Sequence, residues 1–149
     1  NTVRKLKART QSINPESLKN MNILEAINNE IDRFDRMNFI HSHFEISGNP
    51  FKIPQKDEII FFRIIQEFFS NTIRHSRATD LKIRCIYENK ILKILVSDNG
   101  IGFEITDESK GIGLKNMKTR AELIGAELDI NSIIKKGTTL TIQKKYHET

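Results

Sequence analysis

The sequence predicts an α+β domain, a two-layer sandwich in which a mixed, mainly antiparallel sheet packs on helices. Two observations lead to this fold class. Apolar residues recur at helical spacing through most of the first half of the chain, whereas the second half is mainly strand-like segments separated by short turns. The length of 149 residues, with 38% apolar and 29% charged residues, suits one ordinary globular domain.

The apolar spacing predicts three helices, at about residues 16–37, 54–75 and 114–124. In the first, apolar side chains recur every three or four residues, at Leu24, Ile27, Ile31 and Phe34. The second opens at Pro54, where a missing N–H costs little, and it is apolar enough to be largely buried. Gly125 ends the third.

Alternating or continuous apolar runs predict five strands, at residues 40–46, 81–87, 91–97, 128–134 and 138–144. Asn89-Lys90 supplies a short hairpin turn between the second and third strands. Lys135-Lys136-Gly137 turns the chain between the last two.

The composition limits the classes of partner and compartment. A net charge of +5 favours polyanions, but the nine Phe and two Tyr show no alternation with basic residues of the kind that stacks bases. We therefore expect no nucleic acid, while a basic surface also suits a triphosphate. No apolar run is long enough to span a bilayer, no secretory signal opens the chain, and the single cysteine, Cys85, favours a cytosolic setting. Because the chain begins with Asn1 rather than Met, we expect a fragment of a longer protein.

The helix predicted at residues 54–75 carries polar side chains of chemical interest. Glu67 and Asn71 are four residues apart and so lie on one side of the helix. Mg²⁺ prefers oxygen ligands and keeps several waters, so the Asn71 amide oxygen suits it, and Glu67 could order a bound water or assist proton movement. Arg74 and His75 follow one turn later, where a cation could meet a phosphate. Taken alone, Glu67 and Asn71 are better explained by hydrogen bonding of polar groups in a buried helix. A solvated helix end is the alternative for Arg74 and His75.

A second candidate is Asp98, which follows the predicted central strand in the run Asp98-Asn99-Gly100-Ile101-Gly102. An ionised carboxylate only accepts hydrogen bonds, so it suits the N6 amine of adenine and would repel the carbonyl of guanine. Gly100 and Gly102 permit positive φ and a close approach of the backbone to the base. A simple turn is the alternative, because Asp-Asn-Gly is a common turn triplet.

A third candidate is the glycine pair at the start of the last predicted helix. Gly111 and Gly113 stand just before Leu114, where exposed backbone N–H groups and the helix dipole attract phosphate oxygens. Glycines at such junctions are routine, so this motif is weak alone. The order and spacing of the three candidates together favour a site for a Mg-nucleotide.

These segments closely resemble the motifs of bacterial two-component sensor histidine kinases. Residues 62–79 resemble the N box, 96–103 the first glycine box, 111–121 the second, and 137–139 the closing glycine-threonine element. The N box is similar to that of the subfamily that pairs with helix-turn-helix response regulators of the nitrate-sensing and lipid-desaturase type. Residues 13–15 and 23–27 look like the segment that joins the dimerisation helices to the catalytic domain, so the resemblance covers nearly the whole chain.

The resemblance implies the ATP-binding fold of the gyrase, chaperone, histidine kinase and MutL superfamily, with residues 1–15 a remnant of the dimerisation helix or linker and 16–149 the catalytic domain. It also implies roles for single residues. On the adenine side, Asp98 would bind the base, Gly100 and Gly102 would shape its pocket, and Thr138 would line it. On the phosphate side, Asn71 would bind Mg²⁺, Arg74 or His75 would contact the phosphates, and Gly111, Gly113 and Leu114 would form a lid hinge that binds phosphate. Glu67 takes the position where many histidine kinases have Asn and this subfamily commonly has Glu. The lid, residues 103–110, is short.

The acceptor histidine that such kinases need is missing from this chain. The acceptor is usually followed by an acidic residue and lies on a long helix well before the N box. His41 and His43 lie on a predicted strand and are followed by Ser and Phe. His75 belongs to the N box, and His147 lies in the C-terminal tail. We expect the acceptor on a dimerisation domain outside this sequence, so that the chain binds ATP, is a monomer and does not phosphorylate itself. The whole protein would be a homodimer, would pass its phosphoryl group to a response regulator, and could be attached to a membrane.

Two other functions stay open from sequence alone. One is an anti-sigma-factor serine kinase of the same superfamily, against which the run Arg63-Ile64-Ile65-Gln66-Glu67 argues. The other is a degenerate interaction module, which the intact Asp98, Asn71, Gly111 and Gly113 disfavour.

Overall fold

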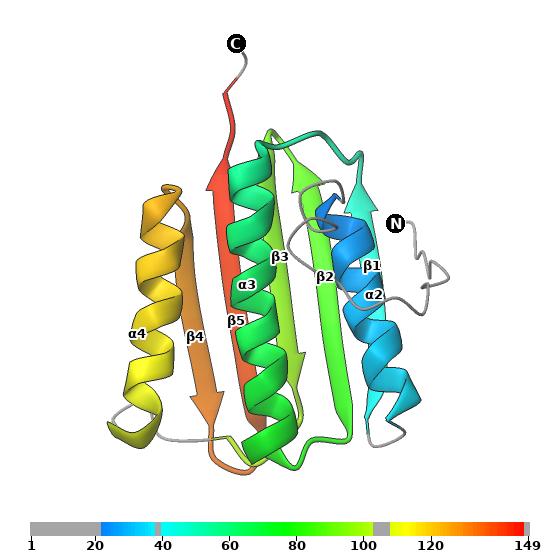
Figure 1. Ribbon diagram of the computed structural model, residues 1–149, viewed down its shortest axis with the longest axis vertical. Coiled ribbons are helices and arrows are strands. Elements are labelled where there is room, and N and C mark those ends of the chain that lie inside the picture. The colour runs from blue at the N-terminus through cyan, green and yellow to red at the C-terminus, as the bar shows by residue number, and fades with distance from the viewer. Residues whose placement is uncertain (1–21, 38–39, 103–107, 148–149) are drawn as a thin grey trace.

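The computed structural model describes residues 22–37, 40–102 and 108–147, apart from the side chains of residues 75, 76 and 108–113. Three helices lie on one face of a five-stranded sheet (Figure 1). The elements in chain order are α2 (Ile23–Arg36), β1 (His41–Gly48), α3 (Gln55–Asn71), the π-helical turn η1 (Thr72–Ser76), β2 (Asp80–Glu88), β3 (Ile91–Asp98), α4 (Glu108–Leu123), β4 (Glu127–Ile133) and β5 (Gly137–Lys145). The predicted two-layer α+β architecture is therefore confirmed.

The sheet is mixed and mainly antiparallel, with strand order β1-β2-β3-β5-β4. Only β1 and β2 pair in parallel, and the crossover between them contains α3. The turn at Asn89 and Lys90 has φ of 51° and 64°, as a tight hairpin turn requires. In the register of the sheet, Asp98 at the end of β3 lies opposite Leu81 of β2 and Thr138 of β5. Pairing on both sides fixes the backbone of Asp98.

The core lies between the sheet and the three helices. Alternate residues of the strands face it, and the side chains of α3 fill its centre; the largest fully buried ones include Phe61, Phe62, Phe69, Leu81 and Ile94. Cys85 of β2 is fully buried, and burial raises the pKa of its thiol. A thiol held neutral in the core is a packing group rather than a nucleophile.

Helix α2 begins at Ile23, not near residue 16 as the spacing predicts. Asn22 is extended (φ −78°, ψ 165°), and its side-chain oxygen accepts a hydrogen bond from Glu25 N at 2.8 Å, which is the geometry of an N-cap. Glu58 Oε2 accepts a second bond from Ile23 N at 2.6 Å. Both bonds satisfy N–H groups that a helix end leaves unpaired, so they set the start of α2. The predicted helical residues 16–21, and the predicted linker at residues 1–15, lie outside the described part of the chain.

The helix predicted to end near His75 changes character before that point. Its α-helical part ends at Asn71 and continues as the π-helical turn η1, after which Arg77 takes the left-handed region with φ of 56°. Single π turns within helices are rare and frequent at functional sites. Here the turn follows directly after the two candidate residues Glu67 and Asn71.

Helix α4 begins earlier than the sequence predicts. It starts at Glu108, so Gly111 and Gly113 lie inside its first two turns instead of in a loop before Leu114. Residues 108 and 110 are Glu and Lys, which are good helix formers, and a helical glycine costs only about 1 kcal/mol relative to alanine. The predicted polar lid at 103–110 therefore ends in helix, while residues 103–107 lie outside the described residues.

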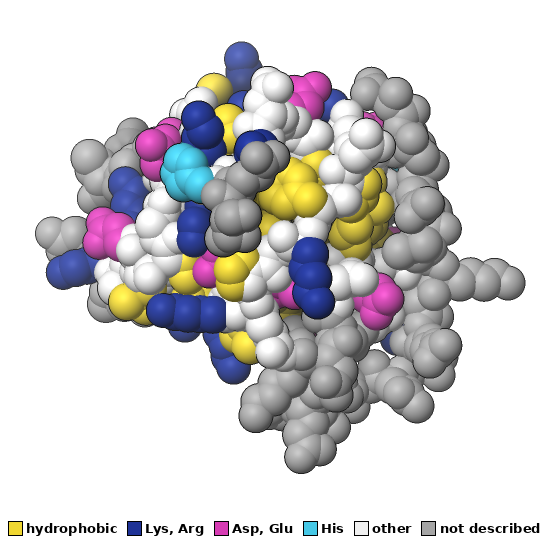
Figure 2. All heavy atoms as spheres, turned by 90° about the horizontal axis from the view of Figure 1, so that it is seen from above, with side chains coloured by type: hydrophobic (Ala, Val, Ile, Leu, Met, Phe, Trp, Pro, Cys, Tyr) yellow, Lys and Arg dark blue, Asp and Glu magenta, His cyan; other side chains and the backbone are white. Residues whose placement is uncertain are grey.

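The opposite end of the molecule, where α3 begins and β5 ends, is held by polar and aromatic contacts. Asp57 of α3 is 4% exposed and accepts hydrogen bonds from Lys144 Nζ at 2.8 Å and Tyr146 Oη at 2.6 Å. The ring of Phe51 packs edge-on against Tyr87 and Tyr146, and Figure 2 shows hydrophobic side chains among charged ones at this end. None of the described helices combines the length and the apolar character needed to span a bilayer.

Candidate functional site

Most of the site residues predicted from the sequence gather at one end of the sheet. Asn71 ends α3, Asp98 ends β3, Thr138 lies near the start of β5, and α4 begins at the same end (the lower end in Figure 1). These elements are adjacent because the β3–β5 ladder pairs Asp98 with Thr138, and α3 contacts α4 across the sheet face. Segments 40 residues apart in sequence therefore contribute to a single site.

Asp98 is the best-organised polar group at this end. Asp98 is only 9% exposed, and its carboxylate accepts three hydrogen bonds from the protein. Thr72 Oγ1 donates to Oδ2 at 2.8 Å, Gly100 N donates to Oδ1 at 3.0 Å, and Thr138 N reaches Oδ1 at 3.4 Å. A carboxylate offers about four acceptor positions, so capacity remains for one ligand donor. The three bonds hold the carboxylate in a fixed orientation, as selective recognition of an amine requires.

The glycines around Asp98 let backbones approach closely. Gly137 has φ of 115°, and a Cβ there would lie 2.1 Å from the carbonyl oxygen of Asp98. Gly102 has φ of 66°, and a Cβ there would lie 2.2 Å from the carbonyl oxygen of Ile133. The expectation of positive φ is therefore met at Gly102. Gly100 is not among the described glycines with positive φ, and its N–H donates a hydrogen bond to Asp98.

Thr138 is buried beside Asp98 and its side chain is held in place. Its hydroxyl shares a hydrogen bond of 2.8 Å with the hydroxyl of Ser132 across the β4–β5 hairpin. Its backbone N–H points to Asp98, so the residue supports the carboxylate through the main chain. The family resemblance implies an adenine-side contact for Thr138, and in the structure Thr138 lies next to Asp98, the residue predicted to bind adenine.

Two residues that organise the site were missed by sequence reasoning. Thr72 bonds directly to Asp98, although the two residues are 26 positions apart and no spacing rule links them. Asn99 accepts bonds of 2.9 Å from the N–H groups of both Thr79 and Asp80, and its amide group donates to their side chains. The triplet Asp-Asn-Gly predicts a turn. It does not predict that Asn99 connects this turn to the start of β2 by hydrogen bonds.

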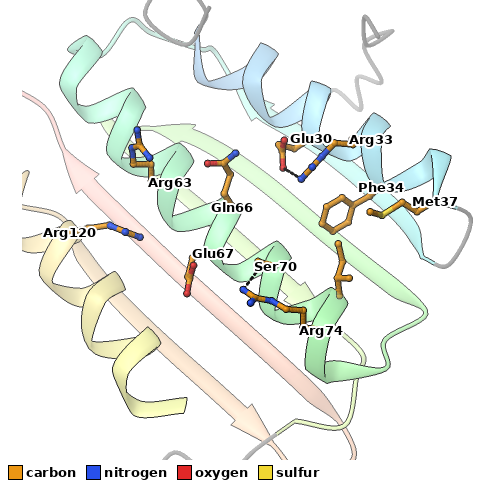
Figure 3. Close-up of a pocket in the computed structure, with 11 residues that line it drawn as sticks. Glu30, Arg33, Phe34, Met37, Arg63, Gln66, Glu67, Ser70, Arg74 and Arg120 are labelled. Carbon is orange, nitrogen blue, oxygen red and sulfur yellow. Dashed lines mark hydrogen bonds and ion pairs between the residues drawn. The ribbon is translucent and has the colours of Figure 1, made fainter. Parts of the chain in front are cut away.

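Glu67 of α3 and Arg74 of η1 contribute to a separate groove, whose described lining does not include Asp98. Together with residues of α2 and α4 they line an open groove of about 440 Å³. Figure 3 shows this groove, with Arg74 turned toward Ser70, whose hydroxyl accepts its hydrogen bond. Among the described residues, neither Asp98 nor Asn71 lines this groove, so the groove is distinct from the predicted position of adenine. Arg74, expected to approach phosphate, is engaged by Ser70 in this structure.

The remaining predicted residues are only partly described. Asn71 and Leu114 are half-buried, and Leu114 packs against the core. For His75, Gly111 and Gly113 the structure gives the helical backbone only. Within the described residues, no three His, Cys, Asp or Glu side chains are grouped as a metal site.

Comparison with known proteins defines the family. Residues 56–148 match the family model described as "Histidine kinase-, DNA gyrase B-, and HSP90-like ATPase", which covers more than half of the chain. The chain belongs to this ATPase family. Its residue pattern and its relatives identify it further as an ATPase domain of the sensor histidine kinase type.

The curated relatives are sensor proteins. Sensor protein VraS of Staphylococcus saprophyticus is 34% identical over 135 residues, which are 88% of this chain and 38% of that protein. Sensor protein VraS of Staphylococcus aureus is 38% identical over 94 residues, which are 62% of this chain and 27% of that protein. The ATPase domain thus spans well under half the length of these relatives.

Solved structures support the fold. The histidine kinase domain of the blue-light activated histidine kinase EL346 of Erythrobacter litoralis aligns with a TM-score of 0.65 over 85% of this chain and 63% of that one, at 19% identity. The longer structure of the same kinase aligns with a TM-score of 0.66 over 85% of this chain and 42% of that one, at 16% identity. At such identities the likeness shows the fold alone.

Proposed function

We propose that this ATPase domain is the catalytic part of a sensor histidine kinase that binds Mg-ATP and donates its γ-phosphoryl group to a histidine on a dimerisation domain. The observation that carries the proposal is Asp98: a buried carboxylate at the end of a central strand, oriented by three donors, beside the end of the N-box helix. An acceptor-only group there selects the N6 amine of adenine.

The phosphate end of the nucleotide would be held by residues of α3 and α4. The Asn71 amide oxygen suits one position on Mg²⁺, and this ion would supply charge neutralisation of the phosphates when bound. Gly111 lies in the first turn of α4, where backbone N–H groups have no partner within the helix and suit phosphate oxygens, and Gly113 follows in the next turn. Glu67, one turn before Asn71, would order water or accept a proton beside the transferred group.

Phosphoryl transfer depends mostly on positioning and charge stabilisation, so the domain needs a second part that brings the imidazole in line. None of the four histidines of this chain has the expected sequence context, and the relatives are much longer proteins. We therefore infer a homodimeric, cytoplasmic kinase core with a separate dimerisation domain and a response regulator as the final acceptor, in line with the subfamily that pairs with helix-turn-helix regulators.

The test is phosphorylation with γ-labelled ATP and Mg²⁺, using this chain and the longer kinase that includes the preceding dimerisation helices. The longer protein should acquire a phosphate that is labile in acid and stable in base, as phosphohistidine is. This chain alone should acquire none, and Asn71→Asp in the longer protein should abolish labelling because a carboxylate repels the phosphates. Acid-stable label on serine would favour the serine kinase alternative, and label on this chain alone would overturn the division of roles.

A further inference from the structure

The groove on the outer side of α3 places three ionisable side chains of two facing helices near one another. Glu67 and Arg63 come from α3 and Arg120 comes from α4, and all three line the groove of about 440 Å³. In Figure 3, Glu67 and Arg120 extend into the same gap between the two helices. A carboxylate of the N-box helix and a guanidinium of α4 thus share one gap.

The other charged groups of the groove already have partners. Glu30 of α2 is bound by Arg33 at 3.0 Å, and Arg74 donates to Ser70. Figure 3 marks these two contacts and no other among the residues that it draws. Glu67 and Arg120 are both half-buried, so each loses part of its hydration without a partner among the residues drawn.

Arg63 is the competing cation for Glu67, but its geometry is weaker. It precedes Glu67 by four residues on the same helix, the less favourable order for a helical ion pair, and it is exposed to solvent. Arg120 approaches from the opposite helix, and a guanidinium can bind a carboxylate through two parallel N–H bonds, which fixes its plane. Arg120 belongs to the helix that carries Gly111 and Gly113, so a pair with Glu67 would join that helix to the N box, which Arg63 would not do.

We propose that Arg120 is a positioning residue for the phosphoryl-transfer reaction, which pairs with the Glu67 carboxylate and holds it in its working orientation beside the phosphates. The inference rests on the proposed function, because it gives Glu67 a task only in that reaction. It adds a contact by which the position of α4, the helix of the second glycine motif, acts on the N box.

The experiment is a double-mutant cycle in the longer kinase, measured as initial rate of histidine labelling over a range of ATP concentrations. Glu67→Gln and Arg120→Gln should each lower the rate at saturating ATP by about tenfold or more, with the KM for ATP within about twofold. The double variant should be no slower than the slower single variant. Arg120→Lys should recover part of the rate, because an ammonium keeps the charge but not the two-bond geometry.

Arg63→Gln is the matched control, since it removes the same charge from the same groove; it should stay within about twofold of the wild-type rate. Unfolding midpoints of all variants show whether a loss of rate reflects a loss of fold. Equal effects of Arg63→Gln and Arg120→Gln, or effects of Glu67→Gln and Arg120→Gln that multiply in the double variant, would overturn the inference while leaving the proposed function standing. A wild-type kinase that labels no histidine would overturn the proposed function itself.

Discussion

Asp98 shows how one residue serves the fold and the proposed chemistry together. Its Oδ1 faces two backbone N–H groups, and its Oδ2 faces the hydroxyl of Thr72. In Asp98→Asn the amide oxygen can keep the two N–H bonds, and the amide NH₂ can donate to the Thr72 hydroxyl, which also accepts. The fold should therefore survive this substitution.

Nucleotide binding should not survive it. The amide NH₂ would present a donor next to Thr72, and the charge that favours the N6 amine would be gone. Loss of a hydrogen bond to a charged group costs up to about 3 kcal/mol, so the affinity for an ATP analogue should fall by about 100-fold. Titration calorimetry checks the affinity and circular dichroism checks the fold; unchanged affinity in a folded Asp98→Asn variant contradicts the adenine assignment.

Gly137 offers a second prediction at the residue scale. Alanine there would bring a Cβ to 2.1 Å from the Asp98 carbonyl oxygen and would also occupy φ of 115°. Gly125→Ala is the matched control, because its φ is 69° but a Cβ there meets no atom within 4 Å. We expect Gly137→Ala to lower the free energy of unfolding by about 3 kcal/mol or more and Gly125→Ala by about 1 kcal/mol. Urea unfolding measures both free energies. Equal losses for the two variants would show that position 137 is not in close contact with the Asp98 carbonyl group.

Single residues also mark the limit of sequence reasoning. Asp98 and Gly102 were predicted because their motif combines a chemical group with local turn requirements, whereas Thr138 was predicted from the family resemblance. Thr72 and Asn99 were missed because their roles come from contacts between segments 19 to 26 residues apart. Such contacts depend on the register of the sheet, which no local pattern states.

At the scale of elements, α3 is tied to β5 by the buried carboxylate of Asp57. Asp57 is hydrogen-bonded to Lys144 and Tyr146, and burial together with the Asp57 hydrogen bond raises the pKa of the Tyr146 phenol. Breaking a buried ion pair by removing one partner typically costs about 3–5 kcal/mol. Asp57→Ala should therefore lower the free energy of unfolding by about 3 kcal/mol.

The exposed ion pair between Arg84 and Glu45, at 3.2 Å, is the control for this prediction. Glu45→Ala should change the free energy of unfolding by less than about 1 kcal/mol, because solvent screens exposed pairs. Denaturant unfolding of both variants makes the comparison. A loss for Asp57→Ala no larger than that for Glu45→Ala would show that the contact does not anchor α3.

Glu58 links the start of α2 to α3 and predicts a pH dependence. Burial raises the pKa of Glu58 above 4.5, despite the opposing effects of the bond from Ile23 N and of Lys52. A raised carboxyl pKa stabilises the fold below the unfolded pKa of 4.5, and this contribution is lost as the pH rises through the folded pKa. Glu58→Gln does not titrate and keeps an acceptor for Ile23 N.

The stability of the wild type relative to Glu58→Gln should therefore increase as the pH falls from 7 to 4. Thermal unfolding midpoints of both proteins at the two pH values test this. A difference between the two midpoints that stays constant with pH, or that moves the other way, contradicts the assigned effect of burial.

Among the elements, strands were predicted better than helix ends. Alternating or continuous apolar runs place both ends of every strand within two residues of the observed ends. The predicted start of α2 was wrong because it is set by hydrogen bonds to Asn22 and to Glu58 of another helix. The predicted start of α4 was wrong because glycines such as Gly111 and Gly113 lower helix stability by only a small amount. The π turn after Asn71 left no periodic signal in the sequence.

At the scale of the whole molecule, the two-layer class followed from the order of patterns, whereas the strand order β1-β2-β3-β5-β4 did not. That order matters because it puts β3 in the centre with β5 beside it, so that Asp98, Thr138 and the end of α3 meet at one end of the sheet. The family match accounts for the fold, and the convergence of these residues accounts for the proposed nucleotide specificity.

The most direct test of the account is calorimetric titration of this chain with a non-hydrolysable ATP analogue in the presence of Mg²⁺, with the matching GTP analogue as control. We expect saturable binding of the ATP analogue, with lower affinity when Mg²⁺ is removed. The GTP analogue should bind at least about tenfold more weakly, since the Asp98 carboxylate would face the guanine carbonyl. Equal affinity for both nucleotides, or no binding of either to a folded sample, would contradict it.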